Sequence, residues 1–170
     1  MASEAEFWKW ALKKWGEEGV EPQLLELQDD HQLVVLEILM AAWLGSLGIR
    51  LSEGGWQAMT AAADPWVAGV VLPLRERRIA WRGHGEHQGL YSEVKKLELA
   101  AERSLASIYV EALAEMPDFG AVPPGQAALH TGEWSLSNGP IAENLAWVLS
   151  RAHPSVADEH ALRVTRLLGA

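Results

Sequence analysis

The sequence contains no cysteine among its 170 residues. Disulfide bonds, thiolate catalysis and cysteine-ligated zinc sites are therefore excluded. Proteins of the reducing cytosol do without disulfides, so a cytoplasmic location is the simplest expectation. The alternation of apolar and polar residues that is typical of strands is also missing, as is any internal repeat. Neither a β-rich fold nor a repeat fold is expected.

Basic residues are scarce relative to acidic ones. Fourteen Lys and Arg stand against 23 Asp and Glu, which gives a net charge of −9 and an isoelectric point near 5.1. Duplex nucleic acid and anionic membrane surfaces both attract a positive protein face. The charge balance therefore argues against both as partners.

Long apolar runs are also scarce. The longest, residues 33–47, is interrupted by Glu37 and is shorter than the roughly 20 residues that cross a bilayer. The opening residues, MASEAEFWKW, have no basic segment leading into an apolar one, so no signal peptide is expected. The sequence predicts a soluble cytoplasmic protein.

Phenylalanine and tyrosine occur only twice each, whereas tryptophan occurs nine times. A large indole buries much apolar area and needs an N–H partner when it is buried. We interpret the tryptophans as pillars of the core. The alternative is that two or three of them line a pocket for a flat or apolar ligand.

What the sequence does contain is helical apolar spacing along most of its length. Trp8, Leu12 and Trp15 predict the buried stripe of a first helix, which Gly16 and Gly19 end. Ser52 is expected to cap a helix, Asp64-Pro65 to begin one and Pro73 to kink or split it. Further helices are expected at a short segment around residues 24–27 and at residues 33–47, 91–116, 141–152 and 156–168.

The fold class that follows is all-α. We expect a compact Trp-rich multi-helix bundle over residues 1–116, with the apolar helix 33–47 at its centre. In the helix 91–116 Glu98 is expected in solvent, and the predicted apolar stripe consists of Leu97, Ala101, Leu105, Ile108 and Ala112. A Pro/Gly-rich connection at residues 117–140 then leads to a C-terminal two-helix extension, residues 141–170, that packs on the same domain.

An ordered set of short motifs resembles a known family. FWxxAL at residues 7–12, LQD at 27–29, VVLPLRERR at 70–78 and ELAAER at 98–103 occur with tryptophans between them. Together, over about residues 6–113, they resemble a proteobacterial family of short helical proteins known only as a domain of unknown function. The resemblance implies a compact bundle and a cytoplasmic bacterial protein, and it implies no activity.

One departure from that family concerns the start of the central helix. The family has a polar Asp-Val-Asn piece there, whereas this chain has Val34, Val35 and Leu36, followed by Glu37. Any role of the Asp and the Asn of that piece is therefore either absent from this chain or carried by Glu37.

Glu37 is the residue that breaks the apolar pattern. It shares a helix face with Leu33, Met40 and Leu44, and a lone buried carboxylate is costly unless it is paired or protonated. Our preferred interpretation pairs it with Arg75 or Arg78. The alternatives are a polar floor to a Trp-lined pocket and simple exposure at the helix edge. The binding hypothesis comprises Glu37, Arg75, Arg78, Trp43, Trp66, Gln28 and Asp29.

Two other clusters of polar residues are candidates for a metal-binding site. Asp29 and Asp30 could hold Mg²⁺ for diphosphate chemistry, but no further carboxylate follows within a turn. We interpret Asp29, Asp30 and His31 as the polar start of the central helix. In HGEHQG, residues 84–89, two histidines lie three apart in a predicted loop without a third ligand. No metal, no cofactor and no catalytic residue is therefore predicted.

The one dense basic stretch is PLRERRIAWR, residues 73–82. Basic residues interleaved with tryptophan can bind single-stranded nucleic acid. Ion pairs with acids of neighbouring helices are the preferred interpretation, with contact to an anion or an acidic partner as the runner-up.

The preferred hypothesis is a non-catalytic protein-interaction or regulatory module with a protein partner; a homodimer is also considered. Its expected contact surfaces are residues 75–82 and the Pro-rich segment with the C-terminal helices. The alternative is a ligand-binding or enzymatic bundle with a pocket over Glu37, Arg75 and nearby tryptophans.

Overall fold

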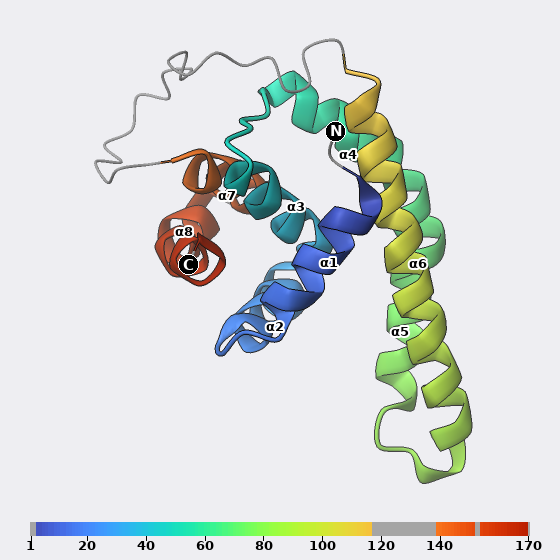
Figure 1. The fold of residues 1–170 in the computed structure, drawn as a ribbon. Coiled ribbons are helices and arrows are strands. Elements are labelled where there is room, and N and C mark those ends of the chain that lie inside the picture. Colours follow the sequence, from blue (N-terminus) through green and yellow to red (C-terminus); the bar gives the residue numbers. More distant parts are fainter. Residues whose placement is uncertain (1–2, 117–138, 152–153, 170) are drawn as a thin grey trace.

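The computed structural model describes residues 3–116, 139–151 and 154–169 and contains no strand in these ranges. The all-α prediction is confirmed, and none of the described helices is long and apolar enough to cross a membrane. The helices are α1 (Glu4–Trp15), α2 (Val20–His31), α3 (Val35–Ser46), α4 (Glu53–Trp66), a π-helical turn η1 (Val67–Val71), α5 (Leu72–Trp81), a 3₁₀ turn η2 (Gly85–His87), α6 (Gln88–Ala114), α7 (Pro140–Ser150) and α8 (Pro154–Gly169) (Figure 1).

Helix α1 begins at a capping box in which Ser3 and Glu6 satisfy each other's backbone N–H groups. Its buried face consists of Phe7, Ala11 and Lys14. The predicted stripe was wrong by one position, since Leu12 is 54% exposed and the flanking tryptophans are only half-buried. Large indoles can cover the core from the edges of a helix, which leaves the central positions to smaller side chains.

Helix α3 lies at the centre of the bundle, as predicted. Every residue from Val35 to Gly45 is buried, because α1, α2, α6, α7 and α8 all pack around this helix. Gly45 lies in the last turn of the helix, one residue before its end at Ser46. A Cβ at Gly45 would come within 2.4 Å of the backbone of Ile141, so the glycine permits the close approach of α7.

Helices α4 and α5 run on through the π-helical turn η1. Ser52 caps α4 as predicted, its hydroxyl accepting from the backbone N–H of Gly55 at 3.1 Å. The predicted start at Asp64-Pro65 was wrong, because Pro65 lies within α4. Pro73 does split the helix: its ring would clash with the carbonyl four residues earlier, and the π-helical turn precedes it there.

Helix α6 folds back along α5 after a turn at residues 82–87, and the α5–α6 hairpin projects away from the other helices (Figure 1). The buried face of α6 includes Val94, Glu98, Ala101, Leu105 and Tyr109. Ala101 and Leu105 of the predicted stripe are buried, but Leu97 is 55% exposed, and the expectation of a solvated Glu98 was wrong. The face of α6 that is buried also carries the ionic contacts with α5 described below. Those contacts cannot be seen from the spacing of apolar residues in the sequence.

The C-terminal helices complete the core. Helix α7 packs on α3, and α8 packs on α7, α2 and α3. Asn144 fixes α7 in place, since its amide donates to the carbonyls of Ala41 at 3.2 Å and Ile49 at 2.9 Å and accepts from Leu51 N–H at 3.2 Å. The predicted connection, residues 117–140, lies outside the described residues except for its last two positions, and the division into domains stays a prediction.

Tryptophan forms only part of the core. Trp43 and Trp56 are buried, and Trp56 stacks on the half-buried Trp147 with ring centroids 5.1 Å apart and planes at 13°. Trp8, Trp10, Trp15, Trp66 and Trp147 pack around the core from half-buried positions. The interpretation as core pillars therefore holds in full for two described indoles, and the other five named here border the core.

Candidate functional site: a cleft beside Glu37

Glu37 is buried, with 4% of its surface exposed, and both of its carboxylate oxygens are bonded. The hydroxyl of Tyr109 on α6 donates to Oε1 at 3.3 Å, and the guanidinium of Arg151, directly after α7, donates to Oε2 at 2.7 Å. The predicted pair with Arg75 or Arg78 was wrong, because those arginines bond to acids of α6 instead. We call Glu37, Tyr109 and Arg151 the Glu37 cluster.

The environment of Glu37 disfavours its charge. Burial raises the pKa of the Glu37 carboxyl above its ordinary value, and the nearby Asp64 carboxylate adds to that effect. Arg151 and the hydrogen bond from Tyr109 oppose it without cancelling it. Burial also raises the pKa of Tyr109 well above its usual value, and the charge of Glu37 raises it further. The tyrosine therefore keeps its proton and acts as a hydrogen-bond donor to the carboxylate.

A cleft of about 260 Å³ opens beside this cluster. It is lined by residues 31–34 of the α2–α3 connection together with Glu37, Asp64 and Arg151. Gln32, on its rim, has a φ of 56°, the only positive φ of a non-glycine residue in the described chain. Such backbone strain recurs at binding sites. The cleft is next to Glu37, where the pocket hypothesis places it. Its lining does not include the expected Arg75, Trp43 and Trp66.

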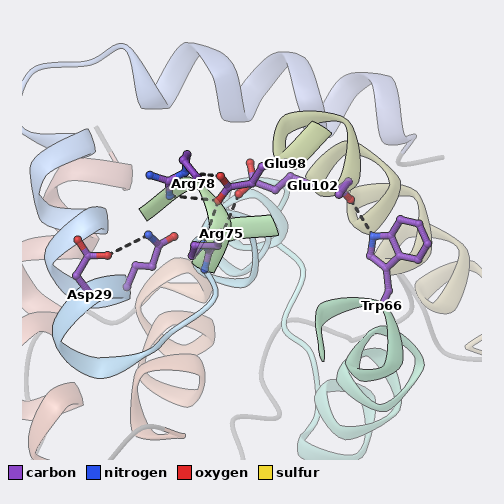
Figure 2. Close-up of polar contacts among 8 residues, drawn as sticks. Asp29, Trp66, Arg75, Arg78, Glu98 and Glu102 are labelled. Carbon is purple, nitrogen blue, oxygen red and sulfur yellow. Dashed lines mark hydrogen bonds and ion pairs between the residues drawn. The ribbon is translucent and has the colours of Figure 1, made fainter. Parts of the chain in front are cut away.

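A second ionic group, the Arg75–Glu98 cluster, lies within the α5–α6 hairpin. Arg75 donates from Nε to Glu98 at 3.2 Å and from Nη2 to Glu102 at 3.3 Å. Arg78 donates to both oxygens of Glu98, as Figure 2 shows. The prediction that these arginines pair with acids of a neighbouring helix is confirmed. The hydrogen bonds of Glu98 raise the pKa of Arg78, and burial raises the pKa of Glu102 against the pull of Arg75.

The remaining residues of the binding hypothesis lie apart. Trp43 packs on Phe7 in the core, with ring centroids 5.3 Å apart. Trp66 donates from its indole N–H to the carbonyl of Ala101 at 2.9 Å (Figure 2). Gln28 is buried and bonds to the exposed Asp29 beside it at 3.2 Å. The seven residues of the hypothesis therefore do not form one site.

Asp29, Asp30 and His31 end α2 rather than begin α3. Val34 stands at the N-cap of α3 and provides no side-chain hydrogen bond, so the interpretation as a polar helix start was wrong. The chain needs a break between the two helices, and the left-handed Gln32 supplies it. In the described ranges no three His, Asp or Glu side chains are placed to share a metal ion.

These features define an all-α protein with one ionic cluster sealed between two helices and another that opens on a cleft. The chain matches, over residues 6–108, the family described as "Protein of unknown function (DUF2390)", and it belongs to that family. No curated protein and no solved structure gave a significant match. The matched range includes every member of the Arg75–Glu98 cluster, whereas Tyr109 and Arg151 fall beyond it.

Some of the ionic partners in the two clusters could be anticipated from the sequence, and others could not. Glu98 and Glu102 lie one helical turn apart, and a hairpin about residues 83–87 brings them near Arg75 and Arg78; that signal was available. Asp64 and Tyr109 carried no such signal. Arg151 is 114 residues away from Glu37, and nothing in the spacing links the two.

Proposed function

We propose that this protein is a non-catalytic interaction module that presents the α5–α6 hairpin to a protein partner. The observation that supports the proposal is the exposure of apolar side chains there. Of the eight large hydrophobic residues that are exposed in the described chain, five belong to the hairpin. They are Leu72, Ile79, Leu90, Leu97 and Leu99.

The positions of these side chains are regular. Leu72 and Ile79 are seven residues apart on α5, and Leu90 and Leu97 are seven apart on α6, so each pair follows one line along its helix. Exposed apolar lines are a feature of helices that bind a partner. The hairpin projects from the bundle (Figure 1), and its own ionic cluster holds α5 against α6.

The charged residues of the hairpin indicate which kind of partner surface can bind it. Arg75 and Arg78 are occupied by Glu98 and Glu102, so the basic stretch offers a partner only Arg77 and Arg82, which are exposed. In a chain of net charge −9 these are two exposed cations near the exposed Ile79, with the exposed Glu76 next to Arg77. The partner face that fits is apolar with acidic residues at its border.

Chemical cross-linking in a lysate of the source organism, followed by affinity capture, tests the proposal. One variant carries Arg77→Glu and Arg82→Glu, and a second carries Ile79→Ser and Leu90→Ser. The matched control carries Leu162→Ser and Arg163→Glu, which alter an exposed leucine and an exposed arginine on α8.

We expect a discrete cross-linked species that both hairpin variants lose and the α8 control retains. A species that survives both hairpin variants would contradict the proposal. Sedimentation equilibrium of the purified protein separates a foreign partner from a second copy; a dimer that the hairpin variants dissociate would replace the proposed partner by the chain itself.

A further inference from the structure

We propose that the cleft beside Glu37 binds a small organic cation, an ammonium or guanidinium group, between the carboxylates of Glu37 and Asp64. This inference goes beyond the proposed interaction role and does not depend on it. The two rest on different parts of the molecule.

The charge content of the cleft is the first support. Two carboxyl groups line it, from Glu37 and Asp64, together with one guanidinium, from Arg151, and the imidazole of His31. Asp64 is exposed and has no hydrogen bond or ion pair with any residue that the structure describes. It is also close enough to Glu37 to raise the pKa of that carboxyl. When both carboxyl groups are ionised and the imidazole is neutral, the lining carries one uncompensated negative charge, which a monovalent cation would balance.

The second support is the group that is paired with the Glu37 carboxylate in this structure. Oε2 of Glu37 already accepts a guanidinium, that of Arg151, at 2.7 Å. The side chain of Arg151 is 36% exposed, whereas that of Glu37 is 5% exposed. Arg151 also lies over the ring of Trp147, with its guanidinium carbon 5.6 Å from the ring centroid. Arg151 therefore shows which chemistry the carboxylate accepts, and its exposed guanidinium can move away from Glu37 while it stays over the ring of Trp147 when another cation replaces it.

The size and shape of the cleft are the third support. A volume of about 260 Å³ lies just below the range of typical ligand pockets, so a small metabolite fits and a large cofactor does not. Leu33 and Val34 supply apolar wall for the carbon chain of such an amine. The strained Gln32 holds its backbone at the rim.

In the proposed complex the ligand's N–H groups donate to Oε2 of Glu37 and to Asp64. Arg151 then gives up its bond to Glu37 and keeps its contact with Trp147. Tyr109 continues to donate to Oε1, which holds the carboxylate in place. Binding is therefore a competition between the ligand and the chain's own guanidinium.

Two-dimensional NMR titration of the full chain tests this inference. The probes are methylguanidinium chloride and butylammonium chloride; sodium butyrate and 1-butanol are the anionic and neutral controls, all at constant ionic strength. We expect saturable shifts of the amides of residues 31–34 and of the indole N–H of Trp147 with both cations only. Equal shifts with butyrate, or shifts that never saturate, would overturn the proposal.

Three variants sharpen the test. Asp64→Asn should weaken methylguanidinium binding about tenfold, because one charge-assisted contact is lost. Glu53→Gln, which removes another exposed acid from α4, should leave binding unchanged. Arg151→Met keeps an unbranched chain near Trp147 but removes the competing guanidinium, so it should bind methylguanidinium more tightly than the wild type. It should also gain thermal stability from the probe.

Each variant result decides the matter. If Arg151→Met binds no more tightly, the competition is not present and the proposal fails. The same holds if Asp64→Asn and Glu53→Gln behave alike. Since Asp64 and Arg151 both reach solvent, these variants are expected to fold, and their amide spectra report directly whether they do.

Discussion

The two ionic clusters of this protein differ in how their charges are enclosed. In the Arg75–Glu98 cluster both partners of the central bond are buried, with side-chain exposures of 9% and 8%, and α5 and α6 enclose them. In the Glu37 cluster only the acid is buried, and its arginine is 36% exposed beside a cleft. A sealed pair stiffens a hairpin, whereas a half-open pair can exchange its partner. The comparison separates a structural use of buried charge from one suited to binding.

The sealed cluster should respond most strongly to the loss of its acid. Glu98→Gln leaves two guanidinium groups without their full charge partner between α5 and α6, and neither can turn readily into water. We expect a loss of about 3 kcal/mol in the free energy of unfolding, measured by urea denaturation. Glu93→Gln removes an acid whose ion pair with Lys96 is exposed and should change stability by less than about 0.5 kcal/mol. A Glu98→Gln protein as stable as this control would show that the hairpin does not rely on the pair.

The next effect concerns the position of α7, which carries Arg151 to the open cluster. Gly45→Ala places a Cβ within 2.4 Å of the backbone of Ile141 and forces α3 and α7 apart. Overpacking of this kind costs about 1 to 3 kcal/mol, more than the helix propensity that alanine adds. Gly54→Ala is the control, because a Cβ there meets nothing within 4 Å. Equal melting temperatures of the two variants would contradict the close packing.

The open cluster should tolerate the loss of its acid better than the sealed one. Glu37→Gln keeps an acceptor for Tyr109, and Arg151 can turn into solvent, so we expect a change of no more than about 1 kcal/mol at neutral pH. A loss as large as that of Glu98→Gln would remove the contrast between the clusters. Urea denaturation of both variants under identical conditions makes the comparison.

The pH dependence of the same variant tests the burial of Glu37. The folded-state pKa is raised above 4.5, so the folded protein holds a proton that the unfolded chain has released. The stability contributed by this group therefore falls as the pH rises from about 4.5 through the folded pKa. The stability of the wild type relative to Glu37→Gln should decline across that window and then level off. A difference that rises with pH would mean that Arg151 outweighs burial.

The smallest effect concerns the two acids of the cleft. The Asp64 carboxylate contributes to the raised pKa of Glu37, so Asp64→Asn should lower the pKa of the Glu37 carboxyl slightly, as followed by ¹³C NMR. Glu93→Gln, on the projecting hairpin, should leave it unchanged. No movement in Asp64→Asn would place the two carboxylates too far apart to share a cation.

Much of the fold could be predicted from the sequence because it depends on local rules. The central helix 33–47 was predictable since a helix that is apolar all round must be covered on every side. Ser52 and Pro73 marked a cap and a split because each acts through its own backbone contacts. The need for glycine at Gly45 could not be predicted from the sequence, because only the neighbouring α7 imposes it.

Glu37 was identified from the sequence as the exception in an apolar helix, and its burial followed from its position. The choice of its partner could not follow, because the chain offers several arginines and only the packing of α7 on α3 brings Arg151 to it. The Arg75–Glu98 pairing was within reach of sequence reasoning, since one hairpin decides it. Charge, composition and helical spacing thus determined an acidic all-α protein, while the tertiary structure decided which charges meet. Ion pairs depend on distance in space, and the residues of the cleft come from segments far apart in the chain.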